Sequence, residues 1–205
     1  MKPGRLAPVT LMLWLGTLPT TVHSAPPAAM ISSDTLIRTS TAQPVEIIHT
    51  SLEFAVDFGP FTQHLEALLG RYDPSAVRQL VATDPAMADA RLAQMEGEEG
   101  LMIFMVQNHG ALLNLAGAPR RAMRYHVGNP RIALQMTRHD IRAGLYAPLS
   151  VLVYEAGPGA VRVEFDQPST LFGQFGDAEI GAVGRELDGK LARVLGHAAR
   201  LAAQP

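Results

Sequence analysis

The sequence predicts an α+β fold, a two-layer sandwich in which helices lie on one face of a mainly antiparallel sheet. Two segments that alternate apolar and polar residues, 149–154 and 161–166, flank a Gly-Pro-Gly turn, which predicts a hairpin and therefore antiparallel pairing. Residues 180–201 repeat apolar positions at spacings of three and four, which predicts a long amphipathic helix that Asp177 can cap. Because such elements each have one apolar side, they bury it by packing in layers.

The N-terminus has the pattern of a secretory signal peptide, which we place at residues 1–24. A basic start precedes a short apolar segment, residues 6–18, and Val22 and Ser24 suit the positions that a signal peptidase reads. We expect cleavage after Ser24, or after Ala25 as second choice, and a periplasmic or secreted protein. A retained N-terminal anchor is the alternative.

A single domain is expected to follow the signal. Residues 25–44 are rich in Ala, Pro, Ser and Thr and predict a flexible segment, whereas residues 45–202 are long enough to form one core. The chain has no cysteine, which excludes thiol catalysis and cysteine-ligated clusters. A net charge of −2 without a basic cluster argues against binding of nucleic acid. Apart from the cleaved signal peptide, it also argues against binding of a membrane.

The first elements of the domain are a strand and two helices. Residues 52–58 alternate apolar and polar and predict a strand, which Gly and Pro then break. Residues 61–72 have apolar positions at helical spacing. A second helix is expected over 85–95, with Thr83 or Asp84 as its cap and Pro at its first position.

Further strands follow. Residues 101–106 are continuously apolar, which suits a strand covered on both faces. Residues 108–110 form a turn, and 111–115 are a candidate for a neighbouring strand. Residues 123–127 predict the next strand.

Gly128-Asn129-Pro130 predicts a turn and a helix start. Gly128 provides conformational freedom, Asn129 is a good helix cap, and Pro130 has the backbone angle of a first helical turn. We expect this helix to run to about Arg138.

These motifs, in their order, resemble the bacterial domain-of-unknown-function family 302. The resemblance covers about Val45 to Ala199 and rests on Gly128-Asn129-Pro130, on the strands at 148–155 and 161–166, and on Gln167-Pro168-Ser169. It implies a compact α+β domain, often a homodimer, without an established activity or catalytic residues. The chain departs from the shorter family pattern by its export signal and by the helical region 73–95, which would cover a groove of cytosolic relatives.

Four residues are candidates for ligand binding: His109, His126, Asn129 and Arg131. A helix start carries free amide donors and a partial positive charge, so Asn129 with Arg131 suits an anion. The alternative is that Asn129 only caps the helix, and Pro130 removes one of the donors.

A metal or haem site is an alternative function. His109, His126 and His139 come from neighbouring strands and a helix end, and methionines add soft ligands that suit periplasmic copper. Against this, the chain has no His-x-His pair and no histidine pair at helical spacing.

A hydrolase is the third hypothesis, with His109, Asp140 and either Ser150 or Ser169. The Gly-x-Ser-x-Gly motif of a nucleophile elbow is absent, so the sequence favours a protein that is not an enzyme. We therefore expect an exported domain that binds a small ligand or a partner, forms a homodimer and needs no cofactor.

Overall fold

The computed structural model describes residues 39–204. The expected signal peptide, and most of the segment 25–44, lie outside the described residues. Contacts divide the chain after Pro44, and the unit that begins at Val45 contains every element named below. Within the described range, no helix has the length and apolar character needed to cross a membrane.

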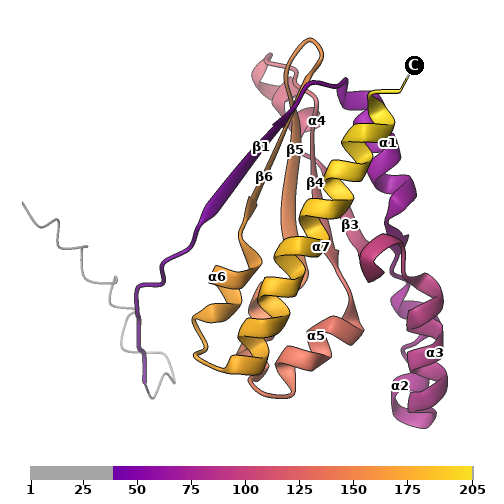
Figure 1. Ribbon diagram of the computed structural model, residues 1–205, viewed down its shortest axis with the longest axis vertical. Coiled ribbons are helices and arrows are strands. Elements are labelled where there is room, and N and C mark those ends of the chain that lie inside the picture. The colour runs from indigo at the N-terminus through magenta and orange to yellow at the C-terminus, as the bar shows by residue number, and fades with distance from the viewer. Residues whose placement is uncertain (1–38, 205) are drawn as a thin grey trace, which may run out of the picture. The chain divides into compact units, whose positions relative to one another are not determined.

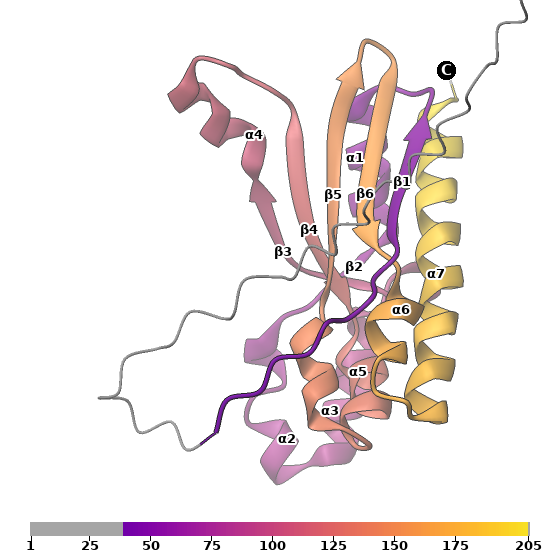
Figure 2. The ribbon, with the colours of Figure 1, turned by 90° about the vertical axis from the view of Figure 1, so that its left-hand side faces the viewer.

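A six-stranded mixed sheet forms the domain, and it is antiparallel except for one short parallel pair (Figures 1 and 2). The strand order is β1-β6-β5-β4-β3-β2, and only β2 runs parallel to its neighbour β3. The strands are β1 (His49–Phe54), β2 (Gly70–Arg71), β3 (Met102–Asn108), β4 (Ala122–Gly128), β5 (Leu149–Gly157) and β6 (Ala160–Asp166). The predicted α+β class and the β5–β6 hairpin are confirmed.

The longer helices line one side of this sheet (Figure 1). Helix α7 packs against α1, α5 and α6, while α3 contacts α5 at the end of the sheet. The helices are α1 (Phe58–Leu68), α2 (Leu80–Thr83), α3 (Pro85–Met95), α4 (His109–Leu112), α5 (Pro130–Thr137), α6 (Pro168–Gly173) and α7 (Ala178–Ala202). Short 3-10 turns are η1 (Pro74–Ala76), η2 (Glu98–Gly100), η3 (Leu113–Ala116) and η4 (Ile141–Tyr146).

The core lies between the sheet and helices α1 and α7. Alternate strand residues point toward the helices, because successive side chains of a strand lie on opposite faces. The fully buried members include Tyr125, Val153 and Val163 from the sheet and Phe61, Phe172 and Leu195 from the helices. Each such side chain contributes about 1.5 to 3 kcal/mol by its burial.

The intervening residues form a second surface, which we call the open face because no helix of the described domain covers it. Their register places them in cross-strand rows, and most are exposed or half-buried. The open face consists of Met105 and Gln107 of β3, Ala122, Arg124 and His126 of β4, Ser150, Leu152 and Tyr154 of β5, Arg162, Glu164 and Asp166 of β6, and His49, Ser51 and Glu53 of β1.

Three segments differ from the sequence prediction. The strand expected over 52–58 is β1 at His49–Phe54, and the Gly and Pro expected to break it lie in the first turn of α1, which begins at Phe58. The helix expected over 61–72 ends at Leu68, and Gly70 begins β2, where an added Cβ would lie 1.8 Å from the Met95 carbonyl oxygen. Residues 111–115, expected as a strand, continue α4 and η3. The Asn108 side chain caps this turn by accepting a hydrogen bond from the Ala111 amide at 2.9 Å. In such short apolar segments, hydrophobic periodicity alone does not distinguish a strand from a helix.

The role of Gly128 also differs from the prediction. It is the last residue of β4 and does not have a positive φ, so it needs no unusual backbone freedom. An added Cβ would lie 3.3 Å from Pro148, so the position requires a small residue for space. The other two parts of the motif are confirmed, since Asn129 caps α5 and Pro130 begins it.

Candidate functional site

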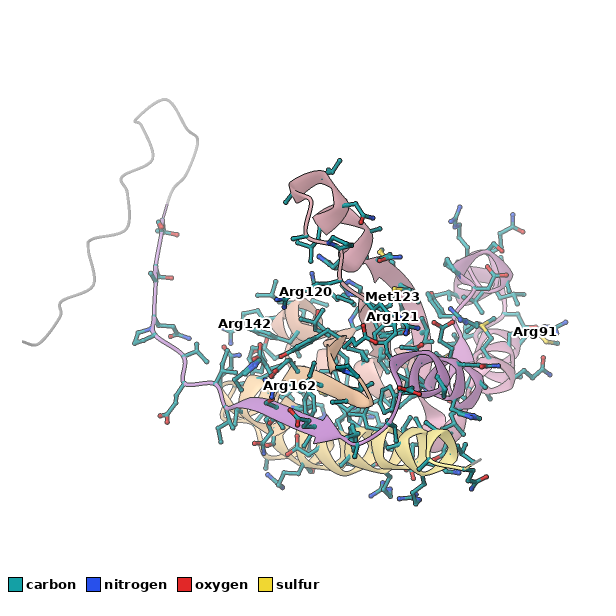
Figure 3. The ribbon with its side chains drawn as sticks, turned by 90° about the horizontal axis from the view of Figure 1, so that it is seen from above. Arg91, Arg120, Arg121, Met123, Arg142 and Arg162 are labelled. Atoms are coloured by element: carbon teal, nitrogen blue, oxygen red, sulfur yellow. The ribbon has the colours of Figure 1, made fainter. Side chains whose placement is uncertain are left out.

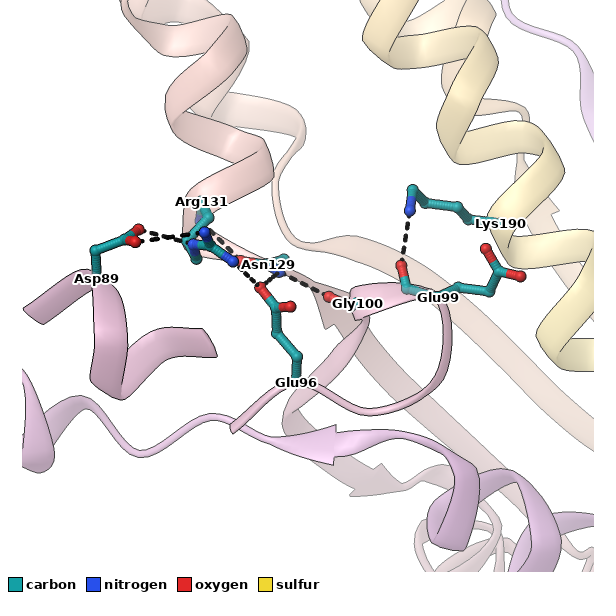
Figure 4. A network of polar contacts seen from close by, with 7 residues as sticks. All are labelled: Asp89, Glu96, Glu99, Gly100, Asn129, Arg131 and Lys190. Carbon is teal, nitrogen blue, oxygen red and sulfur yellow. Dashed lines mark hydrogen bonds and ion pairs between the residues drawn. The ribbon is translucent and has the colours of Figure 1, made fainter. Parts of the chain in front are cut away.

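Asn129 joins three parts of the chain at the start of α5 (Figure 4). Its Oδ1 accepts a hydrogen bond from the Arg131 amide at 2.8 Å, which is the predicted capping bond. Its Nδ2 donates to Glu96 Oε1 and to the Gly100 carbonyl, both at 2.7 Å. The side chain is buried and its polar groups are all used within the protein. These contacts indicate a structural role.

Arg131 is held by carboxylates in the same network. Its guanidinium donates to Asp89 at 2.7 Å and to Glu96 at 2.9 Å. Hydrogen bonds to Asp89, then to Glu96, raise the pKa of Arg131. The hollow beside it, of about 450 Å³, is lined by Asp89, Glu96, Glu99 and Glu186 against Arg131 and Lys190. Because the lining has more negative than positive charges, the geometry does not favour an anion here.

The three predicted metal-ligand histidines lie in different surroundings. His109 begins α4 and is exposed, and His126 lies on the open face with its Nε2 3.3 Å from Gln107 Oε1. Desolvation and the charge of Arg124 lower the pKa of His126. His139 has its Nδ1 3.5 Å from Asp177 Oδ2. Across residues 39–204, no three His, Cys, Asp or Glu side chains form a group able to hold a metal ion.

The residues of the hydrolase hypothesis are engaged elsewhere. Asp140 pairs with Arg142, Ser150 Oγ accepts from Arg124 at 2.8 Å, and Ser169 Oγ accepts from Gln167 at 2.9 Å. The hydrogen bonds made by histidine rings in the described chain go to carboxylates or to an amide, and none goes to a hydroxyl. The arrangement therefore lacks the paired nucleophile and base that acyl transfer requires.

Two adjoining hollows lie at the other end of β4, and both contain Arg120 and Arg121. The first, of about 510 Å³, lies between α1, α4 and the start of β4. The second, of about 760 Å³, lies between the loop before β4 and the β5–β6 hairpin. They share Pro119, Arg120, Arg121 and Glu155, and we call the combined hollow the arginine pocket.

Arg121 is oriented by contacts that leave donors free. Its guanidinium carbon lies 4.7 Å from the centre of the Phe58 ring, a cation–π contact. Its one carboxylate contact in the described chain joins Nη1 to Glu155 Oε1 at 3.5 Å, and the side chain is 52% exposed. Figure 3 shows Arg120 and Arg121 beside Met123, where the hairpin that carries α4 leaves the sheet.

Arg120 is exposed, and no carboxylate of residues 39–204 forms an ion pair with it. Gly110 allows α4 to pack directly on the backbone of Arg120. A Cβ added at Gly110 would lie 2.1 Å from the Arg120 carbonyl oxygen. This close approach sets one wall of the pocket. Of the predicted site residues, His109 is next to a lining residue but does not itself line the pocket.

Arg120 and Arg121 are not among the residues predicted from the sequence to form a site. The available signal was a pair of adjacent arginines directly before a strand. What makes them a pocket is contact with Phe58 and Glu155, which are distant in the sequence. Such convergence cannot be read from local spacing.

Comparisons with known proteins identify a family without an assigned function. A family model described as "Domain of unknown function DUF302" matches residues 77–198. The match includes most of the helical region 73–95 that the sequence analysis treated as an addition, so that interpretation is wrong for residues 77–95. No protein with a curated description matches.

A solved structure is similar to this chain. It is the crystal structure of an uncharacterized conserved DUF302 protein from Bacillus stearothermophilus. The TM-score is 0.51 and the identity 16%, with 73% of this chain and 97% of that chain covered. At this identity the likeness supports the fold alone.

Proposed function

Because the chain belongs to the DUF302 family, for which no activity is known, we propose a function from its own geometry. The protein is an exported domain that binds a small ligand in the arginine pocket and does not transform it. Export is motivated by the signal-like pattern of residues 1–24, and binding by the two hollows that share Arg120 and Arg121.

The size and lining of the arginine pocket support a small ligand. Small-molecule sites have volumes of roughly 300 to 1,000 Å³ and combine apolar walls with a few polar groups. The first hollow, about 510 Å³, has Phe58 and Met123 as apolar lining and two arginines as donors. Its single threonine, Thr62, donates to the Phe58 carbonyl at 2.9 Å, so it is engaged within α1. This lining suits binding better than nucleophilic catalysis.

A blocked-pocket variant tests the proposal. Ala111 is exposed on α4 and lines the first hollow, so Ala111→Phe should fill it without disturbing the core. Ala90→Phe, at an exposed position of α3 outside the pocket, is the matched control. A library of small metabolites is screened by thermal shift and by NMR on the chain without residues 1–24. Binding that the control keeps and Ala111→Phe abolishes supports the proposal. Binding unaffected by Ala111→Phe, or no binding at all, would overturn it.

A homodimer formed through the open face is a second candidate function. Leu152 lies at the centre of one cross-strand row, with Arg124 on one side and Glu164 on the other. A two-fold axis parallel to β5 would place Leu152 against its own copy and each Arg124 opposite the other copy's Glu164. An axis across the strands would instead bring Arg124 against Arg124. Charge complementarity therefore favours the first arrangement.

The dimer proposal is tested by charge reversal. Arg124→Glu should raise the dissociation constant measured by sedimentation, and the double variant with Glu164→Arg should restore association. Arg138→Glu, at an exposed position outside the open face, is the control. A monomeric wild type, or equal effects of the two arginine variants, would contradict the proposal.

A further inference from the structure

We propose that the ligand of the arginine pocket is a small organic monoanion, with a carboxylate held by Arg120 and Arg121 and an apolar body that packs beside Phe58. This rests on the proposed function and specifies its ligand class. Three features of the pocket point to this ligand class: the charge of the lining, the orientation of Arg121 and the apolar residues next to it.

The lining of the first hollow carries one positive charge in excess. Arg120 and Arg121 are its cations, and Glu155 is its one carboxylate. The second hollow adds Asp57 and Arg162, and Arg162 is already paired with Glu53, so the positive excess belongs to the first hollow alone. One uncompensated charge matches a monoanion better than a phosphate, which carries nearly two charges at neutral pH.

The two arginines differ from the paired arginines of this domain. Arg131 has two carboxylate partners at 2.9 Å or closer, and Arg193 donates twice to Glu99 at 2.7 and 2.9 Å. Arg121 has a single carboxylate contact, at 3.5 Å, and Arg120 forms no ion pair with the described residues. Because these two guanidinium groups lack a close carboxylate partner, their donors are available to a carboxylate ligand, which arginine binds in a bidentate manner.

The Phe58 ring gives Arg121 a defined orientation before a ligand arrives. The ring is buried, with 7% of its residue exposed, and lies beneath the guanidinium, so the donors at the edge of that group remain free. The lining around this pair also includes Met123, Ala122 and Pro119. An anion bound here would therefore have an apolar surface for the rest of its body.

Glu155 is the group that a carboxylate ligand must displace or share. It contacts Arg121 through one oxygen at 3.5 Å, and both side chains are partly exposed. Replacement by glutamine removes the competing charge and keeps the shape. An anionic ligand should then bind more tightly, whereas a neutral or cationic ligand should not gain affinity.

The test uses benzoate, its neutral analogue benzamide, and inorganic phosphate as probes, with binding measured by NMR titration. Benzoate should bind at least tenfold more tightly than either comparison probe, because a charged hydrogen bond is worth about tenfold or more in affinity. Arg120→Gln and Arg121→Gln should each weaken benzoate binding by about tenfold. Glu155→Gln should strengthen it, and Arg138→Gln, outside the pocket, is the control. The NMR spectrum of each variant verifies its fold.

The outcomes separate this inference from the proposed function. Benzoate binding that follows the predicted order, and that Ala111→Phe abolishes, supports both. If benzamide or phosphate binds as tightly as benzoate, or if the arginine variants leave the affinity unchanged, the monoanion inference is wrong. If a neutral or cationic library compound binds and Ala111→Phe abolishes this binding, the proposed ligand-binding function is supported although the monoanion inference is wrong. If no compound binds, both are wrong.

Discussion

Replacement of Asn129 by alanine should destabilise the fold by more than the loss of a helix cap. The side chain makes three hydrogen bonds, one as the cap of α5 and two from its amide to Glu96 and Gly100. These bonds connect the start of α5 to the segment between α3 and β3. The variants N129A, N129S and N129D separate the cap from this connection.

The magnitudes follow from the separate contacts. A helix cap contributes about 1 kcal/mol. A hydrogen bond to a neutral group contributes about 1 kcal/mol, and one to a carboxylate about 1.5 kcal/mol or more. N129A should therefore lower the free energy of unfolding by about 3.5 kcal/mol. N129S keeps a capping hydroxyl and should lose about 2.5 kcal/mol. N129D keeps the cap acceptor but places a carboxylate oxygen against Glu96 and a carbonyl, so its loss should at least equal that of N129A.

The assay is urea unfolding followed by circular dichroism at pH 7, on the chain without residues 1–24. The expected order of stability is wild type, N129S, N129A, with N129D no more stable than N129A. A loss below about 1 kcal/mol for N129A would mean that the bonds to Glu96 and Gly100 contribute nothing net. Full stability of N129D or N129S would show that the side chain acts only as a cap. Either result would refute the reasoning.

Three further predictions concern pH, backbone packing and the core. Hydrogen bonds to Asp166, then to Glu164, raise the pKa of His49 from its ordinary 6.5. Its stabilising contribution is therefore complete below pH 6.5 and is lost as the pH rises through the raised value. His49→Gln should reduce the difference in urea midpoint between pH 5 and pH 8.5, and an unchanged difference would contradict this. Gly110→Ala should displace α4 and lower the melting temperature, because its Cβ would lie 2.1 Å from a carbonyl oxygen of the loop before β4. Unchanged NMR shifts around α4 would contradict that packing. Phe172→Ala, at a fully buried position, should lower the free energy of unfolding by about 3 to 5 kcal/mol in urea titration. A loss below about 1 kcal/mol would mean that this side chain is not part of the core.

Elements whose signal lies within one short segment were predicted well. Helix α7 runs over Ala178–Ala202, and Asp177 caps it by accepting hydrogen bonds from the Glu179 and Ile180 amides. The β5–β6 hairpin has the expected strands, because period-two alternation and a turn motif are local features. Asp84 caps α3 in the same way, by a hydrogen bond from the Met87 amide at 3.0 Å.

Short apolar segments were predicted less well, and the reason is their tertiary environment. Gly70 lies against the backbone near Met95, which places β2 where a helix end was expected. Residues 111–115 have an apolar pattern that suits either a strand or a helical turn, and the cap from Asn108 makes them helical. In both segments a contact decides between conformations of similar local preference.

The sequence by itself determined the fold class, the long helix, the hairpin and the capping role of Asn129, because periodicity and caps depend on residues only a few positions apart. Only the tertiary structure decided the partners of Asn129, the separation of His109, His126 and His139, and the pocket around Arg120 and Arg121. Each of these depends on side chains brought together from distant segments. The spacing of residues along the sequence does not show how close such side chains lie, because the packing of helices and strands determines that distance.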